Sequence, residues 1–169
     1  LPACIAEIIS RRAEIAGLAQ KIAAHDDLFY IGRGPDCPAA AECSLKLKEI
    51  SYIHSEAYAA GELKHGTLSL VTEGTPVIAL ATSPVHYDKM TGNIREVRSR
   101  GGYVILVCAP DFPSPGEYAD DVFILPAADP LFAPLGCVVF SQLLAYETAL
   151  IRGCDVDHPR NLAKSVTVE

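Results

Sequence analysis

The sequence predicts an α/β fold in which a parallel sheet is covered by helices on both faces. Several short runs are apolar without alternation, as is typical of strands that are buried on both sides. Amphipathic helical segments alternate with these runs, as they do in parallel sheets with crossover helices. The 169 residues, half of them apolar, suffice for one domain with its own core. We therefore expect a three-layer α-β-α sandwich with a parallel sheet.

The first elements follow from periodicity and from helix start signals. Over residues 2–24, isoleucine, leucine and alanine recur at every third or fourth position, which predicts one amphipathic helix. The run DLFYIG, which ends in glycine, predicts a buried strand. Pro35, Asp36 and Pro38 are start signals for a second helix, which we expect to continue through Ile50.

The second part of the chain repeats the alternation. TPVIALA, GGYVILVCA and DVFILP predict three further strands, and YDKMTGNIREVRSRGG predicts a helix that stops at its glycine pair. The most apolar segment is LFAPLGCVVFSQLLAYETALI, which Pro134 and Glu147 interrupt. We expect it to be a core helix rather than a membrane span.

The net charge and the cysteines limit which ligands, metals and cell compartments fit this chain. A net charge of −7 argues against nucleic acid or an anionic membrane as the main partner, but it leaves open a small anionic ligand. The six cysteines show no C-x-x-C pairing and no histidine at metal-ligand spacing. They predict reduced, mostly buried thiols in a cytoplasmic protein, and no metal or other cofactor is expected.

A stripe of charge stands out on the second predicted helix. At about 100° per residue, Glu42, Lys46 and Glu49 share one face, with apolar positions on both sides of them. Surface helices keep their charges opposite the apolar face, so this stripe predicts a semi-buried pocket. Carboxylates and an amine in such a pocket acquire shifted pKa values and can exchange protons with a substrate near neutral pH. A helix-supporting ion pair between Glu42 and Lys46 explains the pattern equally well.

Three other segments carry weaker signals. The loop GRGPD follows the first strand, where α/β sheets collect ligands, and it offers backbone N–H groups to an anion, although a purely structural turn is the first interpretation. AYAAGELKHG is a short helix-like piece, and its His65 fits an exposed or structural role. The end of the chain lacks any period, as a frayed terminus does.

Two long runs, LKLKEISYIHSEAYAAGELKHG and DVDHPRNLAKSVTVE, closely resemble the glutamine–fructose-6-phosphate aminotransferases, also called glucosamine-6-phosphate synthases. The resemblance covers essentially the whole chain. It implies the second of the family's two SIS (sugar isomerase) subdomains over residues 1–152, with a flavodoxin-like or Rossmann-like fold. Residues 153–169 then form a C-terminal active-site tail. These enzymes make D-glucosamine 6-phosphate from D-fructose 6-phosphate and glutamine-derived ammonia in hexosamine biosynthesis.

The resemblance also implies a role for each matching residue on the helix and after it. Glu49 is the carboxylate that moves a proton between C1 and C2 of the sugar. Lys46 and Glu42 belong to the same pocket. His65 opens the sugar ring and, in a homodimer, serves the site of the neighbouring subunit.

In the tail, the resemblance makes Lys164 the amine that forms a Schiff base with the open-chain sugar, beside the substrate-binding Ala163. The tail is then a lid that folds over the sugar and excludes water. The glutaminase domain and the first SIS subdomain, with its phosphate-binding Ser/Thr loop, have no counterpart here. We therefore expect a fragment that alone binds sugar phosphate weakly and turns it over slowly or not at all.

Two alternative functions remain open. One is a non-catalytic, phosphosugar-binding SIS module, which would not need Glu49, His65 or Lys164, yet the chain has all three. The other is a fructosamine-phosphate deglycase, against which the ending NLAKSVTVE argues.

Overall fold

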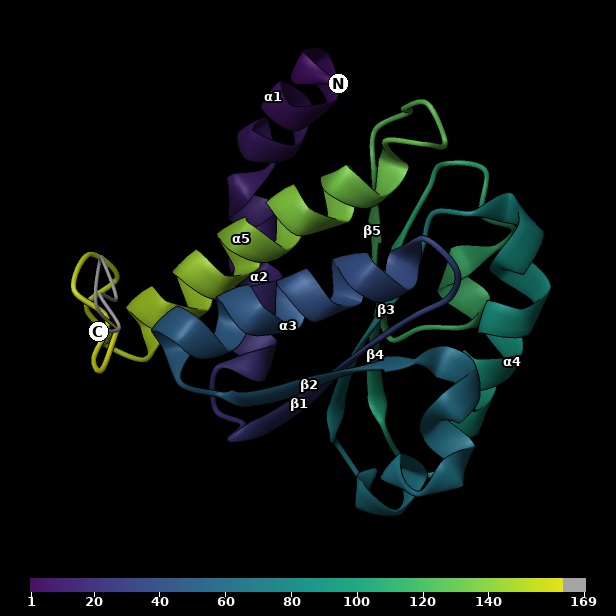
Figure 1. The fold of residues 1–169 in the computed structure, drawn as a ribbon, viewed down its shortest axis with the longest axis horizontal. Coiled ribbons are helices and arrows are strands. Elements are labelled where there is room, and N and C mark those ends of the chain that lie inside the picture. Colours follow the sequence, from purple (N-terminus) through teal and green to yellow (C-terminus); the bar gives the residue numbers. More distant parts are fainter. Residues whose placement is uncertain (163–169) are drawn as a thin grey trace, which may run out of the picture.

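The computed structural model describes residues 1–162 and shows a five-stranded sheet between two helical layers (Figure 1). The strand order is β2-β1-β3-β4-β5, and every neighbouring pair is parallel. The predicted fold class is therefore confirmed. The strands are β1 (Asp27–Gly32), β2 (His54–Ala59), β3 (Pro76–Ala81), β4 (Tyr103–Cys108) and β5 (Asp121–Ile124).

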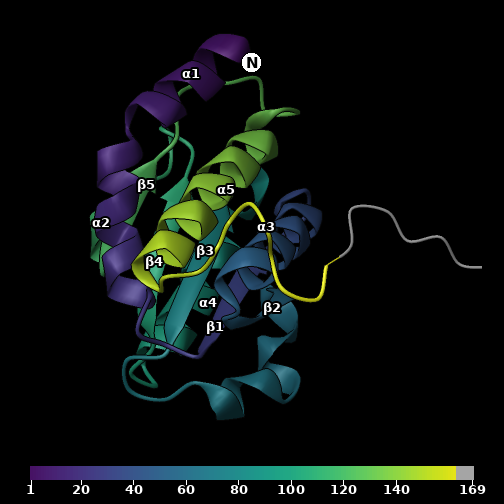
Figure 2. The ribbon, with the colours of Figure 1, turned by 90° about the vertical axis from the view of Figure 1, so that its left-hand side faces the viewer.

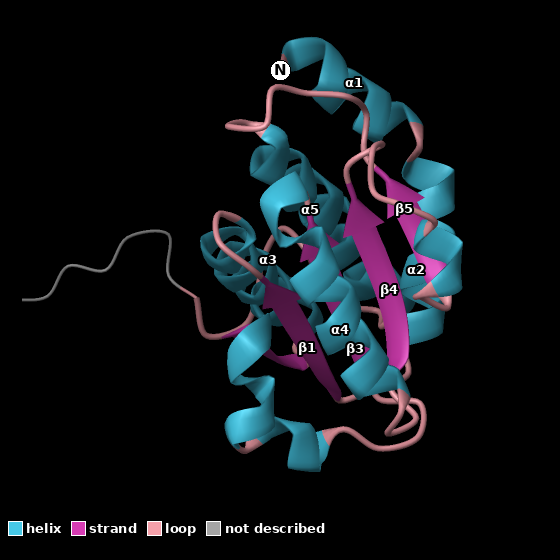
Figure 3. Cartoon of the chain, turned by 90° about the vertical axis from the view of Figure 1, so that its right-hand side faces the viewer, coloured by secondary structure: helices cyan, strands magenta, loops and turns pink. Residues whose placement is uncertain are grey.

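Helices cover both faces of the sheet. Four of them lie on one face (Figure 2), whereas α4 and short 3₁₀ turns cover the other (Figure 3). The α-helices are α1 (Pro2–Ser10), α2 (Arg12–Ile22), α3 (Asp36–Ser51), α4 (Tyr87–Arg98) and α5 (Ala133–Ile151).

Alternating strand residues build two separate cores. Leu28 and Tyr30 of β1 belong to the core under α3 and α5, while Phe29 and Ile31 belong to the core under α4. All six residues of β3 are buried, which is why its sequence is continuously apolar. By length and a mean hydropathy of 1.4, α5 could cross a membrane, but it packs against α2 and α3 in the first core, as the core-helix prediction requires.

The single helix predicted over residues 2–24 is wrong in one respect, because the chain breaks into two helices at Arg11 (φ −92°, ψ 20°). The Arg11 guanidinium lies 3.9 Å above the Phe123 ring and donates to the Ile124 carbonyl at 2.6 Å. These contacts with β5 hold the junction in place. Since no glycine or proline marks the break, hydrophobic spacing alone could not locate it.

The strand β2 was not predicted. Its six residues all pair with β1, but it lies at the edge of the sheet and only Ser55 is buried. The apolar signal of a central strand is therefore missing. The helix-like piece AYAAGELKHG, residues 57–66, was predicted as one unit. In the structure its first three residues end β2, and the 3₁₀ helix η1 (Ala60–His65) follows.

The chain changes direction across the sheet between β1 and β3. After β1 it adds β2 on one side and then crosses to β3 on the other, which makes this gap a topological switch point. The Asp36 carboxylate, only 1% exposed, joins the two strand ends there. It accepts the Thr82 backbone N–H at 2.8 Å and the Thr82 hydroxyl at 2.5 Å.

Candidate functional site

The predicted charge stripe is assembled on α3. Lys46 Nζ lies 2.8 Å from Glu49 Oε2 and 3.7 Å from Glu42 Oε1. The three side chains are between 28% and 44% exposed, so they sit at a rim rather than in an enclosed pocket. Glu49 makes the shorter of the two ion pairs. The helix-supporting pair between Glu42 and Lys46 is present as well, so the two interpretations of the stripe are not exclusive.

Glu49 borders a hollow of about 310 Å³ between the end of α3 and the tail. The helix contributes Leu45, Lys48, Glu49 and Tyr52, and the tail contributes Arg160, Asn161 and Leu162. This volume is at the lower end of the range for small-molecule sites. The predicted site residues Ala163 and Lys164 lie outside the described residues.

The tail is attached to α3 through Tyr52, which ends the helix in a left-handed conformation (φ 61°). The Tyr52 hydroxyl accepts the backbone N–H of Arg160 at 2.9 Å, and the Arg160 guanidinium stacks on the Tyr52 ring at 4.0 Å. Upstream, the Asp155 carboxylate accepts the N–H groups of Asp157 and His158, and these bonds lower its pKa. These contacts argue against the simple frayed terminus that the lack of a period suggested, over residues 155–160.

Lys46 differs electrostatically from the prediction. Its hydrogen bond to Glu49 raises the pKa of the amine, with further help from the charges of Glu49 and Glu42 and against some desolvation. The pKa of this amine is thus shifted, as expected for the stripe, but away from neutral pH. Lys46 is a fixed positive charge that holds the Glu49 carboxylate at the rim of the hollow. A carboxylate held in this way can accept a proton from a bound ligand and return it.

His65 is not brought to this site within the same chain. Because α3 runs back along the sheet, Glu49 lies near the start of β2, whereas η1 follows the end of β2 (Figure 1). The His65 side chain is 65% exposed, and its Nε2 lies 3.9 Å from Glu62 Oε2. One chain therefore presents Glu49 and His65 at opposite ends of the sheet.

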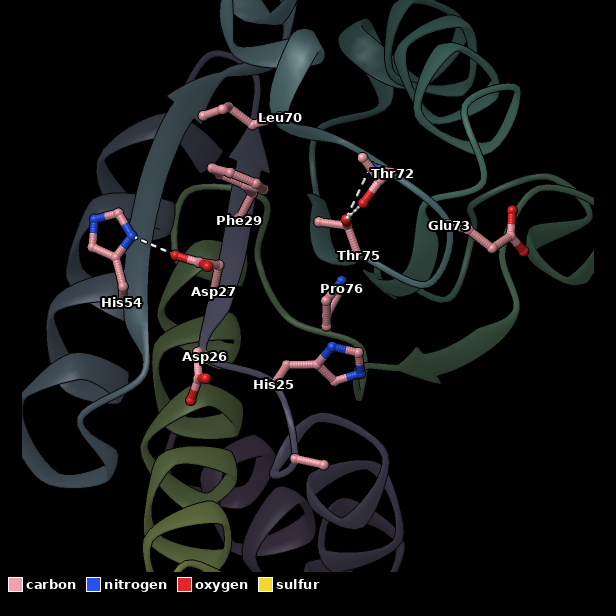
Figure 4. A pocket seen from close by; sticks show the side chains of 11 residues that line it. His25, Asp26, Asp27, Phe29, His54, Leu70, Thr72, Glu73, Thr75 and Pro76 are labelled. Carbon is pink, nitrogen blue, oxygen red and sulfur yellow. Dashed lines mark hydrogen bonds and ion pairs between the residues drawn. The ribbon is translucent and has the colours of Figure 1, made fainter.

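Sequence reasoning missed a larger cavity, of about 500 Å³, at the amino ends of β1, β2 and β3 (Figure 4). Its ionisable side chains are those of His25, Asp26, Asp27, His54 and Glu73, and Thr72 and Thr75 add hydroxyl groups. His54 Nδ1 lies 2.8 Å from Asp27 Oδ1, which ties the starts of β1 and β2 together. Among the described residues, no group of His, Cys, Asp or Glu is arranged to hold a metal ion. The sequence did contain a signal for this cavity. Residues 25–27 (HDD) and His54 are ionisable residues at the starts of strands that turn out to be neighbours.

The cysteines fulfil the prediction of reduced thiols. All six are free, and four of them are buried. Burial raises the pKa of Cys43 and of Cys108 to about 12, which leaves these thiols protonated and unreactive near neutral pH.

Residues 21–152 match the family model of the SIS domain. The chain belongs to the SIS domain family. This SIS domain is 50% identical over 169 residues to the glutamine–fructose-6-phosphate aminotransferase (isomerizing) of Methanosarcina mazei, covering 100% of the chain and 27% of that protein. It is 49% identical over 169 residues to the enzyme of the same name from Thermus thermophilus, of which it covers 28%. The chain thus spans little more than a quarter of these curated relatives.

The comparison with solved structures also relates this SIS domain to the C-terminal part of the aminotransferases. It matches the C-terminal domain of a glucosamine-fructose-6-phosphate aminotransferase from Francisella tularensis with a TM-score of 0.88 and 37% identity, over 92% of this chain and 44% of that one. A glucosamine-6-phosphate deaminase from Thermotoga maritima matches with a TM-score of 0.68 and 25% identity, over 96% and 49% of the two chains. The domain is therefore similar to the isomerase region of the aminotransferases, as its two sequence runs indicated.

Proposed function

We propose that this SIS domain is the isomerase portion of a glutamine–fructose-6-phosphate aminotransferase, which forms D-glucosamine 6-phosphate from D-fructose 6-phosphate and ammonia. The observation that carries the proposal is the Glu49 carboxylate, which lies 2.8 Å from the Lys46 amine at the rim of a hollow shared by α3 and the tail. The 50% identity to the Methanosarcina mazei aminotransferase supports it.

In the proposed reaction, Glu49 takes a proton from C1 of the open-chain sugar imine and returns it to C2. As the C2–N double bond becomes a single bond, the nitrogen gains a proton and the C1 hydroxyl loses one, so that C1 becomes the aldehyde carbon and protons and electrons balance. Lys46 remains protonated and holds the Glu49 carboxylate in position. Lys164 is proposed as the Schiff-base amine, and Ala163 as its substrate-contacting neighbour. Both residues come from the sequence resemblance.

We further propose that the protein acts as a homodimer in which His65 of one subunit serves the Glu49 site of the other. This is supported by the separation of the two residues at opposite ends of one chain's sheet. It follows that the chain alone should turn over sugar phosphate poorly. The six free thiols favour a cytoplasmic location.

A chimera tests the role of Glu49. This chain replaces the matching segment of the Methanosarcina mazei aminotransferase, and glucosamine 6-phosphate formation is measured with fructose 6-phosphate and glutamine. Glu49→Gln should lower kcat by about 100-fold or more, because the amide cannot accept the proton. The control Glu7→Gln removes an exposed carboxylate on α1 and should leave the rate unchanged. Full turnover by Glu49→Gln would leave a non-catalytic phosphosugar module as the better description.

Subunit mixing tests the shared site in the same chimera. Glu49→Gln and His65→Asn are each expected to be inactive alone. After the two proteins are unfolded and refolded together, hybrid dimers contain one intact site, so activity should return to roughly a quarter of the unsubstituted value. Activity that stays at the level of the separate variants would contradict a site built from two subunits.

A further inference from the structure

A second small cavity, of about 180 Å³, lies at the opposite end of the sheet from the Glu49 hollow, at the carboxyl ends of β1 and β2. It borders the topological switch point between β1 and β3, where ligands of doubly wound sheets commonly bind. The GRGPD loop after β1 forms one wall. Its lining residues are Gly32, Arg33, Gly34, Cys37, Ala59, Ala60, Gly61, Glu62, His86 and Lys89.

Basic side chains reach this cavity from three different parts of the chain. Arg33 comes from the loop after β1, His86 from the short turn before α4, and Lys89 from the first turn of α4. Arg33 is half-buried and donates from Nη1 to Asn93 Oδ1 at 2.7 Å, which fixes the guanidinium and leaves its other donors free of protein partners among the described residues. Arginine in a fixed position presents a planar fork that suits the oxygens of a phosphate.

Two glycines make the room that these side chains occupy. A Cβ at Gly61 would lie 3.0 Å from Arg33 Nη1, and a Cβ at Gly34 would lie 2.3 Å from His86 Nε2. Gly34 also has a φ of +56°, which other residues rarely adopt. A larger residue at Gly34 would displace the His86 ring, whereas one at Gly61 would shift the Arg33 guanidinium slightly.

Negative groups near the cavity do not cancel this charge. Glu62 is the acidic lining residue, but its side chain is 70% exposed and lies 3.9 Å from His65. The buried Asp36 directs its carboxylate to the N–H and hydroxyl of Thr82. Among the residues that line the cavity, Arg33 and Lys89 therefore face a single exposed carboxylate.

The backbone hydrogen bonds of the GRGPD loop agree with its first interpretation, a structural turn. The N–H groups of Asp36 and Cys37 donate to the carbonyls of Arg33 and Gly34 within the turn, so they are not available to a ligand. Selection for an anion at this cavity therefore depends on the basic side chains.

We propose that the cavity between the GRGPD loop and the start of α4 is a binding subsite for a phosphate group, held by Arg33, His86 and Lys89. The subsite is separate from the Glu49 hollow and goes beyond the proposed isomerase function. The phosphate can belong to free inorganic phosphate or to a phosphorylated sugar. The cavity has room for the phosphate group and exposes the rest of a sugar to solvent.

The proposal is tested by NMR on the ¹⁵N-labelled chain, titrated with inorganic phosphate and separately with fructose 6-phosphate at constant ionic strength. Sodium chloride serves as the control for general salt effects. We expect saturable shifts of the Gly34, Gly61 and Lys89 amides with both ligands, at millimolar concentration. Tighter saturation by fructose 6-phosphate would assign the subsite to a phosphosugar, whereas equal saturation would assign it to phosphate alone.

Variants give the decisive comparison. Arg33→Met and Lys89→Ala should each weaken phosphate binding by about 10-fold, the loss expected for one charge-assisted hydrogen bond. Arg100→Ala removes a positive charge beyond the far end of α4 and should leave the affinity unchanged. Arg33→Met also removes the hydrogen bond to Asn93 and could disturb folding. Lys89 is exposed, so Lys89→Ala should fold normally and keeps the test valid.

The absence of saturable shifts at these amides, or equal affinity in Lys89→Ala and Arg100→Ala, would overturn the subsite. Chemical-shift changes of amides around Glu49 report on the hollow between α3 and the tail, not on the phosphate subsite. The isomerase proposal is tested in the chimera, so failure of the phosphate subsite and failure of that proposal are distinguishable.

Discussion

At the scale of single residues, Tyr52 shows how a locally unfavourable conformation can serve a site. A left-handed backbone costs roughly 1–2 kcal/mol in a residue other than glycine. At Tyr52 this conformation turns the chain out of α3 beside Glu49, and it presents the phenol ring and hydroxyl to Arg160. The sequence identified Glu49 through its helical spacing. It did not identify Tyr52, because the spacing of apolar and charged residues does not indicate which residue ends a helix with a positive φ.

Asp36 is the residue for which we predict a pH effect. Burial raises the pKa of its carboxyl group, although its hydrogen bonds from Thr82 and the charge of His86 oppose the shift. The folded state therefore holds the proton more tightly than the unfolded chain does. It follows that ionisation of Asp36 reduces stability as the pH rises from the ordinary aspartate range through the raised value.

Asp36→Asn cannot ionise. Its free energy of unfolding, relative to that of the unsubstituted chain, should therefore increase as the pH rises above the ordinary aspartate range. Urea unfolding at a series of pH values measures this difference. Asp88→Asn, in the exposed first turn of α4, is the control and should show no such trend. Parallel pH profiles for Asp36→Asn and the unsubstituted chain would mean that burial does not control the Asp36 proton.

At the scale of elements, the junction of α1 and α2 depends on one side chain. Arg11→Ala removes the hydrogen bond to the Ile124 carbonyl and the stacking on Phe123, so it should lower the free energy of unfolding by about 1–2 kcal/mol. Arg100→Ala, which is exposed, should change it by no more than about 0.5 kcal/mol. Equal effects of the two substitutions in urea unfolding would show that the junction is held by helix packing alone.

Elements were predictable where burial is two-sided. β1, β3 and β4 pack against both helical layers, so their sequences are continuously apolar and easy to recognise. β2 is an edge strand with one neighbour, and its polar residues gave no strand signal. The Arg11 break was likewise invisible, because its cause is a contact with β5 more than a hundred residues further along the chain.

At the scale of the whole molecule, the sequence predicted contacts between neighbouring residues of one helix well. It did not predict where distant segments of the chain meet. The pairing of Lys46 with Glu49 follows from helical spacing, because residues three apart lie side by side. The placement of His65 at the other end of the sheet, the cavity around His25, and the convergence of Arg33, His86 and Lys89 depend on how separate segments meet. Periodicity carries no information about such long-range encounters.

The open side of β2 bears on how the protein behaves at high concentration. An edge strand offers unpaired backbone groups to any other strand, and charged side chains discourage such pairing. His54 and Glu56 stand on that edge. His54→Val combined with Glu56→Val should turn β2 into a template that recruits further chains, detected as fibres that bind thioflavin T. The matched pair Glu7→Val and Lys48→Val, on helices, should stay free of fibres, because helices present no open row of backbone groups for a strand to join.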